Sequence, residues 1–172
     1  MTETLNFGPL AAEDLGQMLE IQEEAFAEMK DVSLLRRNTP EMLAECLQVP
    51  HWTLGAWEGG RLAAFSVLYV PHEASEDLSL SLQDVEWRGG AANNKLCIVR
   101  PEYRGRGLQL RLGGMIEDEA RKRGFALLCA TASPLNTYSC RNLEAQGYRK
   151  NCCLEKYGFS RNLYYKTLSG GF

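Results

Sequence analysis

A glycine-containing turn at residues 104–109 joins a short apolar run at 95–99 to the strongest helical pattern in the chain, at 108–123. Apolar residues of that pattern recur at the three- and four-residue spacing of one helix face, and Gly124 stands where a left-handed C-cap is favoured. A buried-strand pattern follows at 125–132. These segments predict a strand-helix-strand unit, so the chain is expected to build a sheet that helices cover.

Further strands and helices are predicted on both sides of this unit. Strand patterns lie at 5–10, 52–57, 62–70, 148–156 and 163–168, and helical patterns lie at 13–28, after the Thr39 N-cap and at 137–146. The run at 62–70 is apolar on both faces, so it is expected to be a central strand. The predicted fold class is α+β, or mixed α/β, with a mixed sheet between helices.

Residues 71–90 are expected to form a long variable loop or lid. A short helix at 76–83, capped by Ser75, is predicted within it. Trp87 would close over a substrate or anchor the loop to the core. Acidic residues of the loop would suit a cationic amine, although such a charged run is also typical of a solvated face. These residues are Glu73, Glu76, Asp77, Asp84 and Glu86.

Composition limits the class of protein. The 172 residues, 45% of them hydrophobic, are expected to form one domain over 1–172. A net charge of -3 offers no basic field for nucleic acid. No apolar run approaches the roughly 18 residues that span a bilayer and the first residues lack a secretory pattern, so a cytoplasmic protein without a membrane partner is expected. The six cysteines form no CxxC pair, and the sequence has only two histidines, His51 and His72, as further metal ligands. No metal site is therefore predicted.

The turn at 104–109 has the chemistry of an anion site. Glycines at 105 and 107 let backbone N–H groups point toward one place, and the following helix adds the partial positive charge of its N-terminus. This combination favours a phosphate or pyrophosphate, with a plain exposed turn as the alternative. Leu110 breaks the GxGxxG pattern and no GK[ST] follows, so neither a Rossmann fingerprint nor a Walker loop fits.

The residues around the turn resemble a known motif. Ile-Val-Arg-Pro-Glu-Tyr-Arg-Gly-Arg-Gly-Leu at 98–108 is similar to the acyl-CoA-binding motif of the GNAT superfamily of N-acetyltransferases, in which an Arg or Gln precedes x-x-G-x-G/A. Arg104 and Gly107 match this motif, whereas Gln109 replaces the usual Gly or Ala. The longer side chain leaves less room for the cofactor but still allows its N–H to face a phosphate.

A second segment supports the same resemblance. Residues 136–148 are similar to the other signature of the family, in which an Asn opens a helix that ends at Gly-Phe or Gly-Tyr. Asn136 and Gly147 have this spacing, and Ser139 stands where Ala or Ser is common. With both motifs in the expected order, the chain is identified as a member of the GNAT superfamily.

The resemblance implies a twisted, mostly antiparallel sheet of about seven strands, flanked by helices and splayed between the fourth and fifth strands. Acetyl-CoA is the implied cosubstrate, and no metal is implied. Its pantetheine arm would add along the backbone at Cys97, Ile98 and Val99, with Asn136 and Ser139 nearby. The pyrophosphate would be held by the amides of Arg104, Gly105, Arg106, Gly107, Leu108 and Gln109, with guanidinium contacts from the two arginines as an addition.

The residues expected to transfer protons do not match the family pattern as closely as the cofactor motifs do. Acyl transfer requires a proton acceptor, because an amine with a pKa near 10.4 is almost entirely protonated at neutral pH. Many relatives carry a Glu base where this chain has Lys95, so Glu86 or Glu155 would act through water instead. Many relatives protonate the CoA sulfur with a Tyr where this chain has Leu143, so Tyr138 is the candidate donor.

The expected function is transfer of an acetyl group from acetyl-CoA to a primary amine of a small molecule, protein or peptide. Direct transfer in a ternary complex is favoured over an acyl-cysteine, because no cysteine has a histidine near it in sequence. A catalytically inactive acyl-CoA-binding or sensing module is the main alternative, and a phosphate-binding protein for other nucleotides is a further one. The sequence is also compatible with a homodimer.

Overall fold

The computed structural model describes residues 4–168, and within that range seven strands form one mixed sheet with the order β1-β2-β3-β4-β5-β7-β6. All neighbours are antiparallel except β4 and β5, which are parallel. The strands are β1 (Asn6–Pro9), β2 (Trp52–Glu58), β3 (Arg61–Tyr69), β4 (Gly90–Val99), β5 (Phe125–Ala132), β6 (Arg149–Lys156) and β7 (Phe159–Thr167). This arrangement confirms the expected α+β class and the mostly antiparallel sheet.

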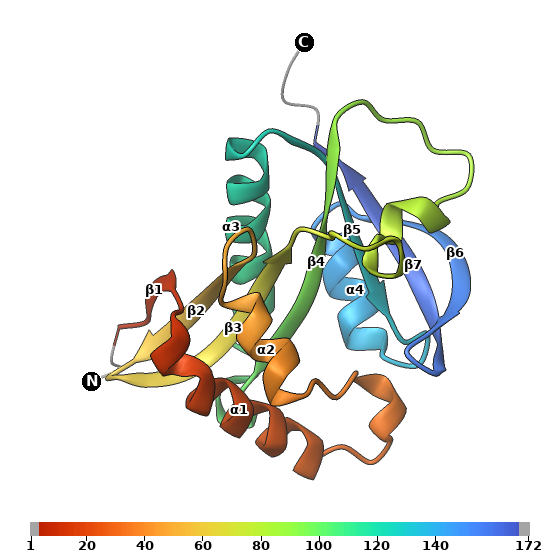
Figure 1. The fold of residues 1–172 in the computed structure, drawn as a ribbon. Helices are drawn as coiled ribbons and strands as arrows, with labels where there is room; N and C mark the ends of the chain where they lie inside the picture. The colour runs from red at the N-terminus through yellow and green to blue at the C-terminus, as the bar shows by residue number, and fades with distance from the viewer. Residues whose placement is uncertain (1–3, 169–172) are drawn as a thin grey trace.

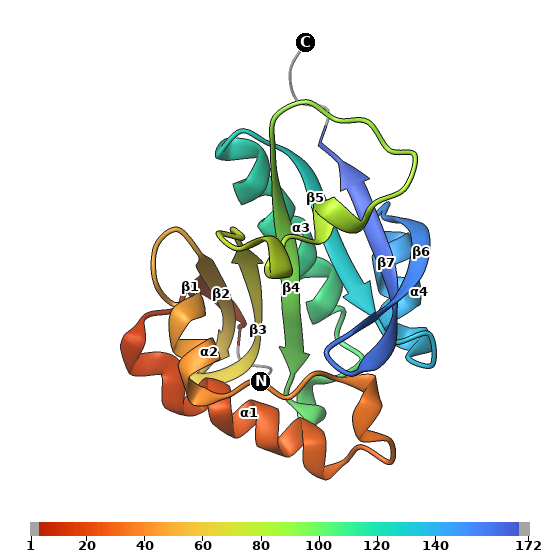
Figure 2. The ribbon, with the colours of Figure 1, turned by 45° about the vertical axis from the view of Figure 1, so that its right-hand side comes forward.

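Two helical layers enclose the sheet. The α-helices are α1 (Leu15–Ala27), α2 (Pro40–Cys46), α3 (Leu108–Lys122) and α4 (Thr137–Ala145). Figures 1 and 2 show α1 and α2 on one face of the sheet and α3 and α4 on the other. Alternate residues of β3 supply both cores: Phe65 and Val67 pack with the α1 and α2 side chains, and Ala64 and Leu68 pack with the α3 side chains. The prediction of a central strand at 62–70 is therefore confirmed.

The parallel strands separate part of the way along their length. Register pairs between β4 and β5 run from Gly90 with Phe125 to Asn93 with Cys129 and continue no further in the part of the chain described. Beyond Asn93, β4 still pairs with β3 as far as Val99. The register with β3 shifts at Lys95, which has no partner there. A bulge of this kind bends a strand, so the free edge of β4 turns away from β5.

Arg100 ties the end of β4 to α1. Its side chain is fully buried, and Nη1 lies 2.9 Å from Glu20 Oε1 and 2.7 Å from Glu24 Oε1. Nε donates to the Leu62 carbonyl at 2.9 Å. Because the charge is compensated and hydrogen-bonded, this guanidinium holds the strand end that leads into the glycine turn.

The structure corrects several expected boundaries. The fourth strand begins at Gly90 rather than at 95, because Gly90, Ala91 and Ala92 pair with Phe125, Leu127 and Leu128 of β5. The last strand begins at Phe159 rather than at 163. The helix expected at 76–83 is replaced by two 3-10 turns, Ala74–Glu76 and Leu78–Ser81. The second turn is capped by Asp77, which accepts from the Ser79 N–H at 3.0 Å, rather than by Ser75.

None of the helices between residues 4 and 168 is both long and apolar enough to cross a membrane.

Candidate functional site

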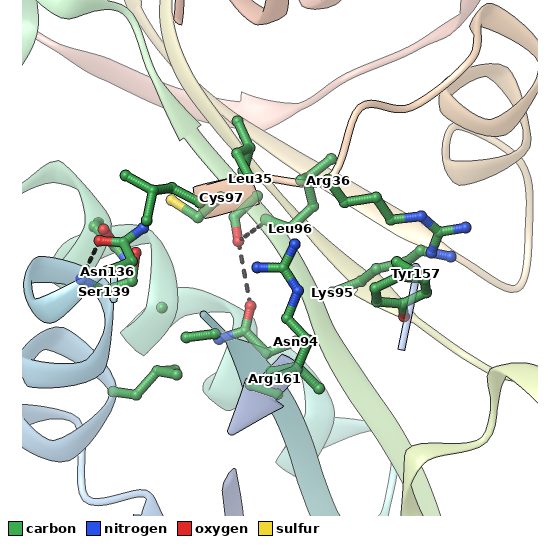
Figure 3. A pocket seen from close by; sticks show the side chains of 18 of the residues that line it. Leu35, Arg36, Asn94, Lys95, Leu96, Cys97, Asn136, Ser139, Tyr157 and Arg161 are labelled. Atoms are coloured by element: carbon green, nitrogen blue, oxygen red, sulfur yellow. Dashed lines mark hydrogen bonds between the residues drawn. The ribbon is translucent and has the colours of Figure 1, made fainter. Parts of the chain in front are cut away.

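A pocket opens where β4 and β5 separate, and its inner volume is about 100 Å³. Residues 94–97 of β4 form one side and residues 130–132 of β5 form the other. Figure 3 shows side chains from both helical layers around this opening. The pocket therefore passes between the two strands from one face of the sheet toward the other.

On the α3 and α4 side of the pocket, α3 closely approaches the residue that follows α4. A Cβ added at Gly113 of α3 would lie 2.0 Å from Oε1 of Gln146, which follows α4. Asn136 caps α4 by accepting the Ser139 N–H at 3.1 Å. The side chains that α3, α4 and their ends contribute to the lining are those of Gln109, Asn136, Ser139, Leu143 and Gln146.

The turn that begins α3 has the backbone geometry of an anion site. Gly105 and Gly107 have φ of +80° and +71°, a region that residues with a side chain rarely adopt. Gly107 is the N-cap and has no side chain to satisfy the first amides of the helix. The first helical bond runs from the Arg111 N–H to the Gly107 carbonyl at 3.1 Å. The amides at 108–110 consequently have no acceptor within the helix and are available to an anion.

The arginine side chains of this turn are already engaged. Arg104 Nη1 lies 3.3 Å from Glu28 Oε2, and Arg106 Nη1 lies 3.5 Å from Glu58 Oε1. Both guanidinium groups are about half exposed, so these ion pairs are weak and can rearrange. The structure thus favours the turn's backbone, rather than its side chains, as the preformed part of an anion site.

On the α1 and α2 side, the lining is positively charged. Leu34, Leu35, Arg36 and Asn38 come from the connection between α1 and α2, and Tyr157 and Arg161 come from the β6–β7 hairpin. With Lys95 of β4, the pocket has three cationic lining side chains, and within residues 4–168 no aspartate or glutamate lines it. Burial is the main factor that lowers the pKa of Arg161, and the positive charge of Arg36 lowers it further.

Lys95 is held by a carboxylate and an aromatic ring. Its Nζ lies 3.3 Å from Glu76 Oε2 and 3.7 Å from the centre of the Tyr69 ring. These two contacts hold the Lys95 side chain in the pocket wall.

Four of the residues predicted for the cofactor site line the pocket, namely Cys97, Gln109, Asn136 and Ser139. Ile98 is buried in the core beside the pocket and Val99 is half-buried. Residues 104–108 lie outside the pocket lining, at the start of α3.

The three predicted catalytic residues lie outside the lining. Tyr138 is 56% exposed, and Glu86 and Glu155 are exposed as well. On α4 the pocket is lined at positions 136, 139 and 143, one helix face, and Tyr138 lies off that face. The catalytic roles of these three residues stay predictions.

The acidic loop does not supply the lining that the sequence suggested. Glu76 faces Lys95, and Asp77 caps the second 3-10 turn. Glu73, Asp84 and Glu86 are exposed. Of the two interpretations of this acidic run, the structure favours the solvated face, because local contacts and solvent take up these carboxylates.

Arg36, Tyr157 and Arg161 were not identified from the sequence. They lie in two segments about 120 residues apart, and only the order of the strands brings them together. The one local signal was the Tyr157-Gly158 pair, which is typical of a hairpin turn.

The thiol of Cys97 lines the pocket in the neutral form. Burial raises its pKa to about 12, and a hydrogen bond with Ser66 opposes this effect only in part. A thiol with this pKa is a poor nucleophile at neutral pH.

Outside the pocket, the structure brings together His51, His72 and Glu45, with their ligand atoms within 4.8 Å of one another. His51 Nδ1 accepts the Val70 N–H at 3.0 Å, so in the neutral ring the proton is on Nε2. Nε2 lies 3.6 Å from Glu45 Oε1. Because a metal needs an unprotonated ring nitrogen, this hydrogen bond opposes metal binding at Nε2.

Comparison with known proteins now identifies the family. The model of the acetyltransferase (GNAT) family matches residues 15–148, so the chain belongs to this family. No curated protein matches the sequence.

Solved structures share the fold at low identity. The ribosomal-protein-S18-alanine N-acetyltransferase from Escherichia coli has a TM-score of 0.75 at 18% identity, covering 98% of this chain and 97% of that one. The protein yncA from Salmonella typhimurium, solved with its cofactor acetyl-CoA, has a TM-score of 0.74 at 15% identity, covering 98% and 96%. An N-acetyltransferase from Staphylococcus aureus Mu50 has a TM-score of 0.72 at 15% identity, covering 95% and 98%.

Proposed function

We propose that this protein transfers an acetyl group from acetyl-CoA to a primary amine by direct transfer in a ternary complex. The observation that carries the proposal is the separation of β4 from β5 beside a helix N-terminus whose amides lack acceptors. Family membership supports the reaction class. Residues 1–172 would form a single N-acyltransferase domain.

Coenzyme A would bind along the free edge of β4 and across the start of α3. The backbone of Cys97, Ile98 and Val99 on the free edge would take the pantetheine arm as an added strand. The amides from Arg104 to Gln109 would hold the pyrophosphate. Asn136 and Ser139 line the same opening. With this placement, the thioester lies within the pocket between the strands.

The chemistry in that pocket is nucleophilic attack by a neutral amine on the thioester carbon, with CoA thiolate leaving. A backbone N–H of β4 near Cys97 or Ile98 would stabilise the negative charge that develops on the carbonyl oxygen. The neutral Cys97 thiol argues against a covalent acyl-enzyme. Glu86 and Glu155 would accept the amine proton only through water, because both lie outside the lining.

Turnover tests the proposal. The protein is incubated with acetyl-CoA and a panel of amines, and free thiol is measured over the rate of background hydrolysis. Thiol release that depends on one or more amines, together with the matching acetylated product by mass spectrometry, is the expected result. If CoA raises the melting temperature but no amine releases thiol, the protein is an acyl-CoA-binding module instead.

A further inference from the structure

Arg161 of β7 is a buried charge without a partner. The residue is 4% exposed. Its Nε and Nη2 have no hydrogen-bond partner within the described chain. Figure 3 shows its guanidinium extending toward the middle of the pocket. A buried unpaired guanidinium strongly favours an anion at that position, because desolvation is otherwise uncompensated.

Arg36 adds a second cation with spare donors. Its Nη1 is buried without a partner in the described part of the chain, and its Nη2 lies 3.9 Å from Glu76 Oε1. Glu76 also pairs with Lys95 at 3.3 Å. One carboxylate therefore faces two of the three cations, and Arg161 is left without compensation.

Tyr157, which packs against Arg36, has a strained backbone conformation. It has φ of +57° and is followed by Gly158 with φ of +82°, as in a tight hairpin turn that suits Asn or Gly at both positions. The ring of Tyr157 lies 3.7 Å below the guanidinium carbon of Arg36. A bulky residue in this conformation is typical of a functional site, where surrounding contacts sustain the strain.

We infer that the acceptor amine carries an anionic group, a carboxylate or a phosphate, which binds between Arg161 and Arg36. This inference rests on the proposed N-acetyltransferase function and narrows its substrate class. A guanidinium pair offers several N–H donors in a planar array, which matches the oxygens of either group. The amine end of such a molecule would then face the opening between β4 and β5.

The placement of these arginines separates them from the proposed coenzyme site. Arg36 lies in the connection between α1 and α2, which cover one face of the sheet, whereas α3, which begins after the glycine turn, lies on the other face (Figure 2). The pyrophosphate would be held at that turn. The anion between Arg36 and Arg161 consequently belongs to the acceptor and not to coenzyme A.

Matched pairs of amines test the inference in the wild-type protein. Each α-amino acid of a panel is compared with its amide, and O-phosphoethanolamine is compared with ethanolamine, by kcat/KM for thiol release. We expect the anionic member of at least one pair to exceed its neutral partner by about 30-fold or more. The pair that shows the preference tells a carboxylate from a phosphate.

Variants assign the preference to Arg161. Arg161→Met is expected to lower kcat/KM for the preferred anionic amine by about 30-fold or more, with KM for acetyl-CoA changed less than about threefold. Its melting temperature should be retained or increased, because an unpaired buried charge is removed. Arg37→Met is the matched control, since Arg37 is exposed and pairs with Glu23 outside the pocket.

The outcomes separate the inference from the proposed function. Equal kcat/KM within every pair, or an anion preference that survives in Arg161→Met, overturns the inference and leaves N-acetyl transfer standing. If no amine is acetylated, the proposed function fails, and stabilisation by inorganic phosphate decides the inference. An anion site requires a higher melting temperature in phosphate than in chloride of equal ionic strength for the wild type but not for Arg161→Met.

Discussion

Asn93 and Cys129 are the last residues at which β4 and β5 stay in register, and the pocket begins one residue beyond them, at Asn94 and Ala130. Cys129 is fully buried, and the Asn93 side-chain amide donates to the Glu76 carbonyl at 2.8 Å. The point at which the strands separate is thus fixed by the core on one side and by the 71–90 segment on the other. A preformed opening of this kind needs no rearrangement of the sheet before a ligand binds.

Gly107→Ala should weaken binding of CoA about tenfold or more. The alanine must adopt φ of +71°, which costs about 1–2 kcal/mol of stability and shifts the amides that face the pyrophosphate. Calorimetric titration and thermal unfolding measure the two effects.

Gly114→Ala is the control for that variant. Gly114 is exposed in the same helix and a Cβ there meets nothing within 4 Å, so the substitution should stabilise the protein by up to about 1 kcal/mol. An equal loss of CoA affinity in both variants would show that the left-handed turn has no special part in binding.

Arg100→Met should destabilise the protein by about 3 kcal/mol, because it removes a buried charge-assisted bond to the Leu62 carbonyl and leaves Glu20 and Glu24 adjacent. Arg61→Met, at a position 45% exposed, should cost less than about 1 kcal/mol. Urea unfolding compares the two. Similar losses would mean that the buried bridge contributes no more than a surface ion pair.

Cys97 should resist alkylation and should not become acetylated. With a pKa of about 12, its thiolate is only about one part in ten thousand of the population at pH 8. Iodoacetamide in the native state should label the exposed Cys153 first, as peptide mass spectrometry would show. Acetyl-CoA without acceptor should add no mass to Cys97. A stable acetyl adduct on this residue would contradict direct transfer.

Stability should fall as the pH decreases below about 6.5, in part because of His51. Burial lowers the pKa of this ring in the folded state, so the unfolded chain binds the proton first. As the pH falls, this loss of stability begins near the pKa of His51 in the unfolded chain. It ends once the pH is below the pKa of His51 in the folded protein. In His51→Asn, whose amide oxygen takes the place of Nδ1, this part of the slope should disappear from urea unfolding curves. An unchanged slope would show that another group is responsible.

Sequence patterns correctly predicted the helices and strands whose own residues have a strong helical or strand pattern. The helix at 108–122 follows from its apolar stripe and its glycine ends, and the double-faced apolar run at 62–70 identified the strand that lies between the two cores. The start of β4 was missed because Gly90, Ala91 and Ala92 have little strand preference of their own and are held in the sheet by pairing with β5.

Part of the pocket lining contributed by α3 and α4 could be predicted from the sequence, whereas the lining on the α1 and α2 side could not. Gln109 and Asn136 lie next to motifs that are contiguous in sequence, so their place in the lining could be expected. Arg36 and Arg161 carry no local signal, because an arginine before a loop or in an edge hairpin is ordinarily solvated. Only the strand order reveals that both line one pocket.

The most direct test of the central claim is a titration of ¹⁵N-labelled protein with acetyl-CoA, followed by amide resonances. The claim requires the largest shifts at residues 105–109 and along the free edge of β4 at 94–98, with Gly114 and the β1–β2 edge little changed. If those two segments are unaffected at saturating acetyl-CoA, or if the shifts gather on a different surface, the opening between β4 and β5 is not the coenzyme site.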